Sequence, residues 1–306
     1  MANDVADLIQ EGYSADLLSA ATSASVIAST ARVVSMGNRS TKLPVLATLP
    51  TAKFVGTSDA DRTKPTSSVG WEHKSLSAQE IAVVIPVRQE DLEDASADLL
   101  AEVARLGGEA IGRTLDAAIL FGDGKPVEWQ SPSLIEAATA AGNVFQVGTG
   151  ADDLAGSFYQ AAGAIADGGY EPSAMAARSS LKYRLANLRG TDNASIFIPS
   201  LNAGVDASDS VAGLNASWST NGAWDSTKAE AIVYDPTRVI LGIRTDIQVS
   251  FADQATVDGI SLFENDMVAL RFRARYGYAL GDVTQNDGRK TTPVSVVTPA
   301  APAAQG

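Results

Sequence analysis

The short stretch from Gly122 to Lys125 (GDGK) is the first candidate for chemistry, because a glycine-rich loop that ends in lysine can bind phosphate. A nucleotide-binding loop of that kind also needs an earlier glycine and a serine or threonine directly after the lysine. The sequence has Ile119 and Pro126 at those two positions. The stretch also follows a helical pattern instead of preceding one. We therefore interpret it as the glycine cap that ends a helix.

Nucleophilic and metal chemistry have no complete set of residues in this sequence. There is one histidine, His73, no cysteine, and no Gly-x-Ser-x-Gly motif. Asp59 and Asp61 resemble the start of a calcium-binding loop, but Lys64 occupies the position that requires glycine. A lone histidine in a β-segment is more often a surface or packing residue than a catalyst. The sequence therefore predicts no catalytic, cofactor-binding or metal-binding residues, and no enzyme.

Charged residues gather in two places, and neither requires catalysis. Carboxylates crowd the start of a helical pattern, where the helix dipole favours negative charge; they are Glu90, Asp91, Glu93, Asp94 and Asp98. Three arginines alternate along a predicted strand and share one face, opposite Leu270, Phe272, Ala274 and Tyr276; they are Arg271, Arg273 and Arg275. In so acidic a chain we expect these arginines to pair with carboxylates, within or between subunits.

These charged groups are positioned by one long helix and two β-regions. Apolar residues recur with helical spacing over residues 89–121, which predicts the helix. Residues 43–85 predict a long two-stranded flap with a polar loop, and residues 230–285 predict further strands. A lone hairpin is only marginally stable in water, so we expect the flap to lie on something, such as a neighbouring subunit.

The remaining segments are predicted from composition and weaker patterns. Shorter helices are expected at residues 3–20, 154–168 and 177–189. Residues 203–228 are rich in Asn, Ser, Gly and Asp, which predicts loops. Residues 291–306 are a proline-containing, low-complexity tail that we expect to be disordered.

Overall composition limits the class of protein. The chain has 306 residues, 45% of them hydrophobic and 19% charged, which is typical of a folded protein with a sizeable core. The acidic N-terminus does not resemble a signal peptide, and no apolar run is long enough to span a membrane. We therefore expect a soluble product made in the cytoplasm. The formal net charge of −13 disfavours non-specific attraction to nucleic acid and favours solubility.

Three blocks of this sequence together resemble the major capsid proteins of tailed bacteriophages with the Hong Kong 97 type of fold. Residues 82–126 are similar to that family's strand, acidic segment and long spine helix that closes on an aspartate and Gly-x-Gly; the matching positions are Glu90, Leu92, Asp94, Asp116, Gly122 and Gly124. Residues 168–193 resemble its Gly-Tyr-x-Pro turn, small strand and helix. Residues 238–283 resemble its closing arginine- and aromatic-bearing strands.

The resemblance implies an α+β architecture, the Hong Kong 97-like capsid fold, with five parts. These are an N-terminal arm (1–42), an extended β-hairpin loop (43–80), a peripheral domain (81–130 and 230–290) with its spine helix at about 95–121, a mainly axial domain (131–229), and the disordered tail (291–306). Compared with members that carry a long N-terminal scaffolding segment, the chain has only about 40 residues before the flap. Scaffolding would then come from a separate protein or not be needed.

The resemblance also implies a function and partners. Copies would form hexamers and pentamers and close an icosahedral shell around double-stranded DNA, without sequence-specific binding and without a membrane. A portal and a decoration protein are further expected partners. The virion capsid is the expected location, after assembly in the host cytoplasm. The residues expected to contact neighbouring subunits are Lys53, Lys64, Lys74, Glu90, Asp94, Arg271 and Arg273. No motif singles out a lysine for a covalent cross-link.

Three alternatives remain open on the sequence alone. A bacterial encapsulin would share the fold but form a nanocompartment loaded with enzymes. A soluble hydrolase or nucleotide-binding enzyme would need a pocket that the sequence does not reveal, and ligand-dependent thermal stabilisation would detect it. A surface or tail structural protein would form filaments or sheets instead of closed shells.

Overall fold

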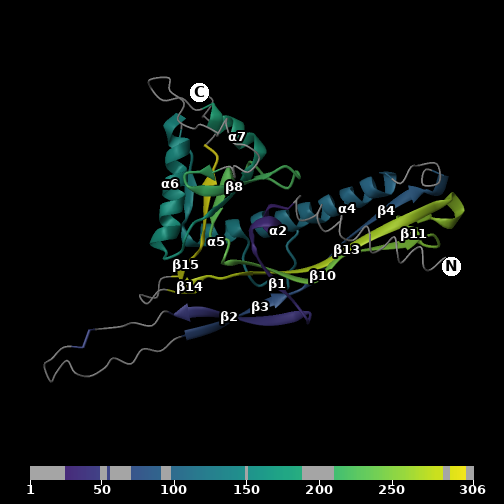
Figure 1. Cartoon of the computed structure of the whole chain (residues 1–306), viewed down its shortest axis with the longest axis horizontal. Helices are drawn as coiled ribbons and strands as arrows, with labels where there is room; N and C mark the ends of the chain where they lie inside the picture. The colour runs from purple at the N-terminus through teal and green to yellow at the C-terminus, as the bar shows by residue number, and fades with distance from the viewer. Residues whose placement is uncertain are drawn as a thin grey trace.

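The computed structural model describes residues 25–48, 54–55, 70–90, 98–148, 151–187, 210–284 and 290–300. A four-stranded sheet, a six-stranded sheet and a separate β-hairpin form its frame, with helices packed on both sheets (Figure 1). The mixed helix and strand content agrees with the expected α+β class. The helix predicted at residues 3–20 lies outside the described residues.

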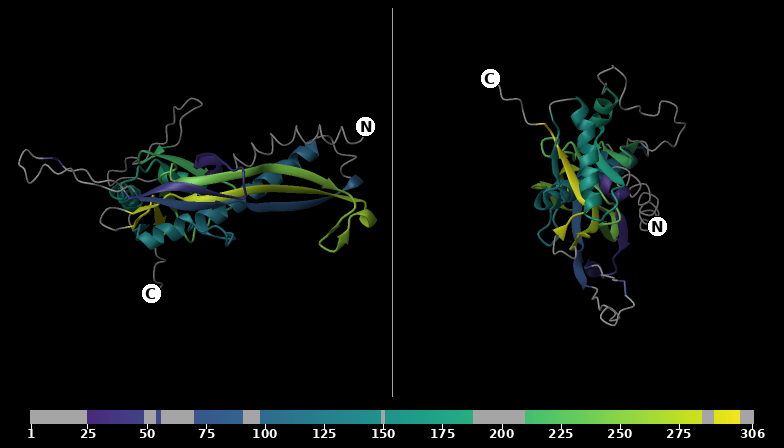
Figure 2. Two further views of the ribbon diagram at one scale, coloured as in Figure 1. Left: turned by 90° about the horizontal axis from the view of Figure 1, so that it is seen from below. Right: turned by 90° about the vertical axis from the view of Figure 1, so that its left-hand side faces the viewer.

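The four-stranded sheet runs along the long axis of the molecule (Figure 2). Its strands lie in the order β1 (Arg32–Ser35), β10 (Val239–Ala252), β13 (Met267–Leu280) and β4 (Gln79–Arg88). β1 is parallel to β10, and the other pairs are antiparallel. The predicted alternation along β13 is confirmed, since its apolar side chains are buried on one face while Arg271, Arg273 and Arg275 lie on the other.

The long helix covers the apolar face of this sheet. It consists of α4 (Asp98–Asp116) and a π-helical turn, η1 (Ala117–Phe121), which confirms the helical pattern over these residues. Ile111 and Leu115 are buried in the main core. Gly107 allows a close approach to the sheet, because a Cβ atom there would lie 2.8 Å from the ring of Phe272. A short helix, α2 (Val26–Thr30), packs against α4.

The six-stranded sheet combines strands from distant parts of the sequence. Its order is β5 (Val144–Gln146), β16 (Val294–Thr298), β9 (Ala231–Tyr234), β6 (Ala174–Arg178), β8 (Leu214–Ser219) and β7 (Ser210–Val211). β16 is parallel to β5 and β6 is parallel to β8, while the remaining pairs are antiparallel.

Helices cover both faces of this second sheet, which explains why its central strands are mostly apolar. α6 (Ala151–Asp167) and α7 (Ser179–Ala186) bury Phe158 and Leu181 against one face. On the other face the sheet shares the main core with α5 (Leu134–Ala141) and the end of the long helix. All four residues of β9 are buried. α6 confirms the helix predicted at residues 154–168. α7 confirms the one predicted at 177–189 over residues 179–186, while residues 177 and 178 belong to β6.

The prediction of a disordered tail at residues 291–306 is wrong for its first part. Residues 294–298 form β16, which lies between β5 and β9 in the interior of the six-stranded sheet. Val294 and Val297 are fully buried. The β-branched residues suit a buried strand, and Pro293 and Pro299 stand just outside it, where proline interrupts no ladder. Residues 301–306 lie outside the described residues.

Two further predictions need correction at the second sheet. Residues 210–219 form β7 and β8, although residues 203–228 were predicted as loops. Here Leu214 is buried and Trp218 packs against the core, so tertiary packing outweighs a loop-like composition. β9 also joins this sheet and not the long one, so residues 231–234 depart from the expected peripheral range of 230–290.

The flap is a hairpin of β2 (Ser40–Thr48) and β3 (Gly70–Ser77), which form a two-stranded sheet of their own. β4 was expected to continue the flap but instead enters the long sheet beside β13. At the opposite end of the long sheet, β10 and β13 are joined through β11 (Thr256–Val257), β12 (Ile260–Ser261) and a 3-10 turn, η2 (Phe263–Asn265). β14 (Val283–Thr284) and β15 (Lys290–Thr291) form a small ladder before β16.

Candidate assembly surfaces

The Gly-x-Gly stretch ends the long helix, as predicted. Gly122 has a left-handed backbone (φ 79°), and its N–H donates to the carbonyl of Ala118 at 3.2 Å. The next N–H, of Asp123, donates to Ala117 at 3.1 Å. Lys125 is not free for phosphate, because its Nζ lies 2.6 Å from the carboxylate of Glu136. This geometry gives the stretch a capping role.

Asp116, the last residue of α4, is the centre of a buried polar network. Its carboxylate is fully buried and accepts hydrogen bonds from the Ser25 hydroxyl (2.7 Å), the backbone N–H groups of Val26 and Ile27, and the Asn221 side chain (2.8 Å). Burial raises the pKa of Asp116, and the four hydrogen bonds oppose that shift. The carboxylate thus joins the start of α2 and the loop after β8 to the long helix.

The hairpin is seated on the long sheet through one buried leucine. Leu76 of β3 is fully buried, beside Met36. Both lie over Gly242 and Gly277, which are paired residues of β10 and β13. A Cβ atom on Gly242 would lie 2.5 Å from both side chains, so the glycine makes the hollow that receives them.

Polar contacts fix the same end of the hairpin. Trp129 donates its indole N–H to the carbonyl of Ser77 at 3.0 Å. Lys74 of β3 forms an ion pair with Asp282 at 2.7 Å, and both side chains are mostly buried. Lys74 was expected to contact a neighbouring subunit, but the structure places it in a contact within the chain. The base of the hairpin is therefore held firmly to the body.

The row of arginines on the face of β13 opposite its buried side chains is, among the described residues, only partly paired with carboxylates. Arg275 forms an ion pair with Glu80 of β4 at 2.7 Å. Its hydrogen bond lowers the pKa of Glu80; burial opposes this shift, and the charges of the three arginines add to it. Arg273 instead donates to the amide oxygen of Gln248 at 2.9 Å, and Arg271 to the hydroxyl of Ser250 at 3.3 Å.

Of the other predicted contact residues, Glu90 is described and lies apart from Arg271 and Arg273. Glu90 is exposed and follows Arg88, the residue at the end of β4 that pairs with Met267. Arg271 pairs with Val84, farther back along β4. Lys53, Lys64 and Asp94 lie outside the described residues, as do Asp59 and Asp61 of the rejected calcium motif. His73 is exposed on β3, as expected of a surface histidine.

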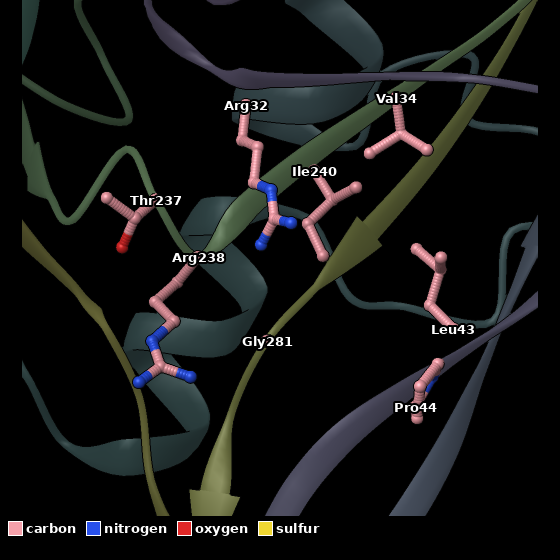
Figure 3. A pocket seen from close by; sticks show the side chains of 8 residues that line it. All are labelled: Arg32, Val34, Leu43, Pro44, Thr237, Arg238, Ile240 and Gly281. Carbon is pink, nitrogen blue, oxygen red and sulfur yellow. The ribbon is translucent and has the colours of Figure 1, made fainter.

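A cavity of about 260 Å³ lies between β1, the start of β10 and the base of the hairpin. Its apolar lining includes Val34, Leu43 and Ile240. In Figure 3 the side chains of Arg32 and Arg238 extend along one side of the cavity, opposite Leu43. Sequence patterns did not indicate these two arginines, because about 200 residues separate them and only the pairing of β1 with β10 brings them together.

The described residues contain neither a metal-ligand cluster nor a membrane-spanning helix. No group of three or more His, Cys, Asp or Glu side chains is arranged to hold a metal ion. No described helix is both long enough and apolar enough to cross a membrane.

Comparison with known proteins gives a consistent match over nearly the whole chain. The model of the phage capsid family matches residues 6–284. A solved protein of Mycobacterium phage Adephagia is 41% identical, with a TM-score of 0.78 and 91% of each chain covered. A protein of Microbacterium phage Oxtober96 is 37% identical, with a TM-score of 0.78 and coverage of 90% of this chain and 91% of that one.

A more distant structure shares the fold. It is described as the capsid of a native GTA particle computed with C5 symmetry, and it is 16% identical with a TM-score of 0.62, over 92% of this chain and 91% of that one. A comparison with curated protein sequences gives no match.

Proposed function

The chain belongs to the phage capsid family as the major capsid protein of a tailed bacteriophage, and we propose that its copies assemble as hexamers and pentamers into an icosahedral shell around double-stranded DNA. The match to phage capsids disfavours the encapsulin alternative. The proposal places assembly in the host cytoplasm, with a portal and a decoration protein as candidate partners and with scaffolding either supplied by a separate protein or not needed. We infer that the protein acts by assembly and not by catalysis.

The observation that carries this proposal is a hairpin that is anchored at its base and whose described strands form a two-stranded sheet of their own. Leu76 and the ion pair of Lys74 hold the base, while the described residues of β2 and β3 pair only with each other. Phe54, in the connection between the two strands, is fully exposed. A two-stranded sheet with an exposed phenylalanine at its end needs an apolar partner to be stable in water. The neighbouring copy supplies that partner, which makes the hairpin the extended loop of the family.

The two sheets then take the two domain roles of the family. The four-stranded sheet with α4 corresponds to the peripheral domain, and the six-stranded sheet with α5, α6 and α7 corresponds to the axial domain. With β9 and β16 included, the axial domain draws on residues 131–229, 231–234 and 294–298. The expected arm of residues 1–42 is corrected in its second part, because residues 26–30 and 32–35 pack in the body as α2 and β1 and Ser40 already begins β2. Residues 1–24 remain the proposed arm towards other copies.

Contacts through a hairpin and an arm suit a closed shell. Each is heterologous, since one surface of a copy meets a different surface of the next, and such contacts can close into rings of five or six. The net charge of −13 suits a container that encloses DNA without gripping it. The same charge makes repulsion between copies, and so the stability of the shell, dependent on salt. Lys53, Lys64, Glu90, Asp94, Arg271 and Arg273 remain proposed contact residues.

Deleting residues 56–68 tests this role of the hairpin. We expect the subunit to remain folded, with unchanged circular dichroism and thermal unfolding, because its base contacts are kept. We also expect stable shells to be lost, as seen by electron microscopy of the variant beside the unaltered protein. Normal shells from the deletion variant would show that the hairpin is not an assembly element.

A further inference from the structure

We propose that the cavity between β1 and the base of the hairpin binds an aspartate or glutamate side chain of a second copy of the chain. This inference rests on the proposed function, because it requires that copies assemble. It adds a specific receptor for a neighbouring subunit, formed by Arg32 and Arg238.

The first argument is the state of the two guanidinium groups. Within the described part of the chain, neither Arg32 nor Arg238 forms an ion pair or a side-chain hydrogen bond. The Arg238 guanidinium lies over the ring of Tyr170, 5.6 Å from its centre. Two guanidinium groups that share a cavity repel each other, and a carboxylate between them removes that repulsion.

The second argument is the lining of the cavity. Val34, Leu43 and Ile240 form apolar walls, and these strengthen any charge pairing that takes place beside them. The guanidinium group is a planar donor that binds a carboxylate through two parallel hydrogen bonds. A side chain with an apolar stem and a carboxylate end therefore matches both parts of the cavity (Figure 3).

The third argument is the source of the carboxylate. Every copy carries 36 acidic and 23 basic residues, so neighbouring copies offer carboxylates in excess. The cavity also includes Leu43 and Pro44 of β2, at the base of the element proposed to reach the next subunit. A DNA phosphate is the less suitable occupant, because a backbone contact favours an open basic groove over a small apolar-walled cavity.

Cross-linking in assembled shells tests the proposal directly. Arg238→Lys keeps the positive charge and supplies an amine that a carbodiimide can join to a carboxylate in contact with it. Shells are assembled from an equal mixture of ¹⁴N- and ¹⁵N-labelled copies of this variant, treated with carbodiimide, and digested for mass spectrometry. We expect a peptide that links position 238 to an Asp or Glu, with about half of the product carrying one light and one heavy chain.

Arg184→Lys is the matched control, because Arg184 pairs with Glu230 inside the chain at 2.7 Å. Its cross-link to Glu230 should contain only light–light and heavy–heavy pairs. The proposal is overturned if position 238 gives no cross-link, or only links within one chain, while the control reacts. Carbodiimide does not join a lysine to DNA phosphate under these conditions. If position 238 is protected from cross-linking only in DNA-filled shells, DNA occupies the cavity and the proposal is overturned.

A second variant separates this proposal from the proposed function. Reversing both charges (Arg32→Glu with Arg238→Glu) should leave a folded subunit and raise the concentration needed for assembly at least tenfold. Unchanged assembly of this variant would contradict the cavity proposal and leave the shell function intact. Failure of the unaltered protein to assemble would count against the shell function itself.

Discussion

At the scale of single residues, Asp116 shows how a buried charge is retained when it is fully hydrogen-bonded. Four donors surround its carboxylate, from α2, from the residue before α2 and from Asn221. The sequence showed Asp116 as part of a family-like pattern but gave no partner, because Ser25 and Asn221 are 91 and 105 residues away in the chain. By contrast, the cap at Gly122 and the two faces of β13 follow from local spacing, and these were predicted correctly.

Replacement of Asp116 by alanine should destabilise the free subunit strongly. Four buried donors would lose their acceptor, and breaking such a network typically costs about 3–5 kcal/mol in the free energy of unfolding. Chemical denaturation of the monomer measures this. Asp123→Ala is the control, since Asp123 is exposed and pairs with Lys228 at the surface, where loss of the pair costs less than about 1 kcal/mol. Equal effects of the two variants would contradict the role given to Asp116.

At the scale of elements, the sequence predicts those whose pattern is local. The long helix has a clear apolar period, and β10 and β13 alternate strongly, so both could be identified. β16 and β8 could not be identified from the sequence. β16 is short and flanked by prolines, and β8 is short and polar. Both are stabilised by strands far away in the sequence: β5 and β9 beside β16, and β6 beside β8. The cavity at the base of the hairpin was beyond prediction for the same reason, since its two arginines meet only through a long-range strand pairing.

Truncation of the C-terminal segment tests the corrected role of β16. Deleting residues 293–306 removes a strand from the interior of the six-stranded sheet, including Val294, Val296 and Val297, each at most 2% exposed. Burying one such side chain contributes about 1.5–3 kcal/mol, so the loss approaches the whole stability of a typical domain. We expect insoluble protein without a cooperative thermal transition.

Deleting only residues 301–306 is the matched control for that truncation, because it leaves β16 complete. We expect this shorter deletion to keep the solubility and the melting temperature of the full chain. A soluble, cooperatively folding product from the longer deletion would show that β16 is dispensable for the sheet.

At the scale of the whole molecule, two rigid sheets share one core, and a hairpin leaves their junction. The main core includes residues of α4, the long sheet and the inner face of the six-stranded sheet, so one hydrophobic core joins the two sheets. Among its described residues, the hairpin joins that body through its base, where Leu76 is buried and Lys74 pairs with Asp282. Such a shape buries little of the hairpin in one copy, and assembly of many copies provides the missing contacts.

Electron microscopy of the purified full-length chain tests the central claim most directly. The protein would be expressed alone and together with a scaffolding gene from the same phage genome. The account predicts closed icosahedral particles under at least one of the two conditions, with five-fold and six-fold clusters visible after reconstruction. A monodisperse monomer, a small ring, or open filaments under both conditions would contradict it.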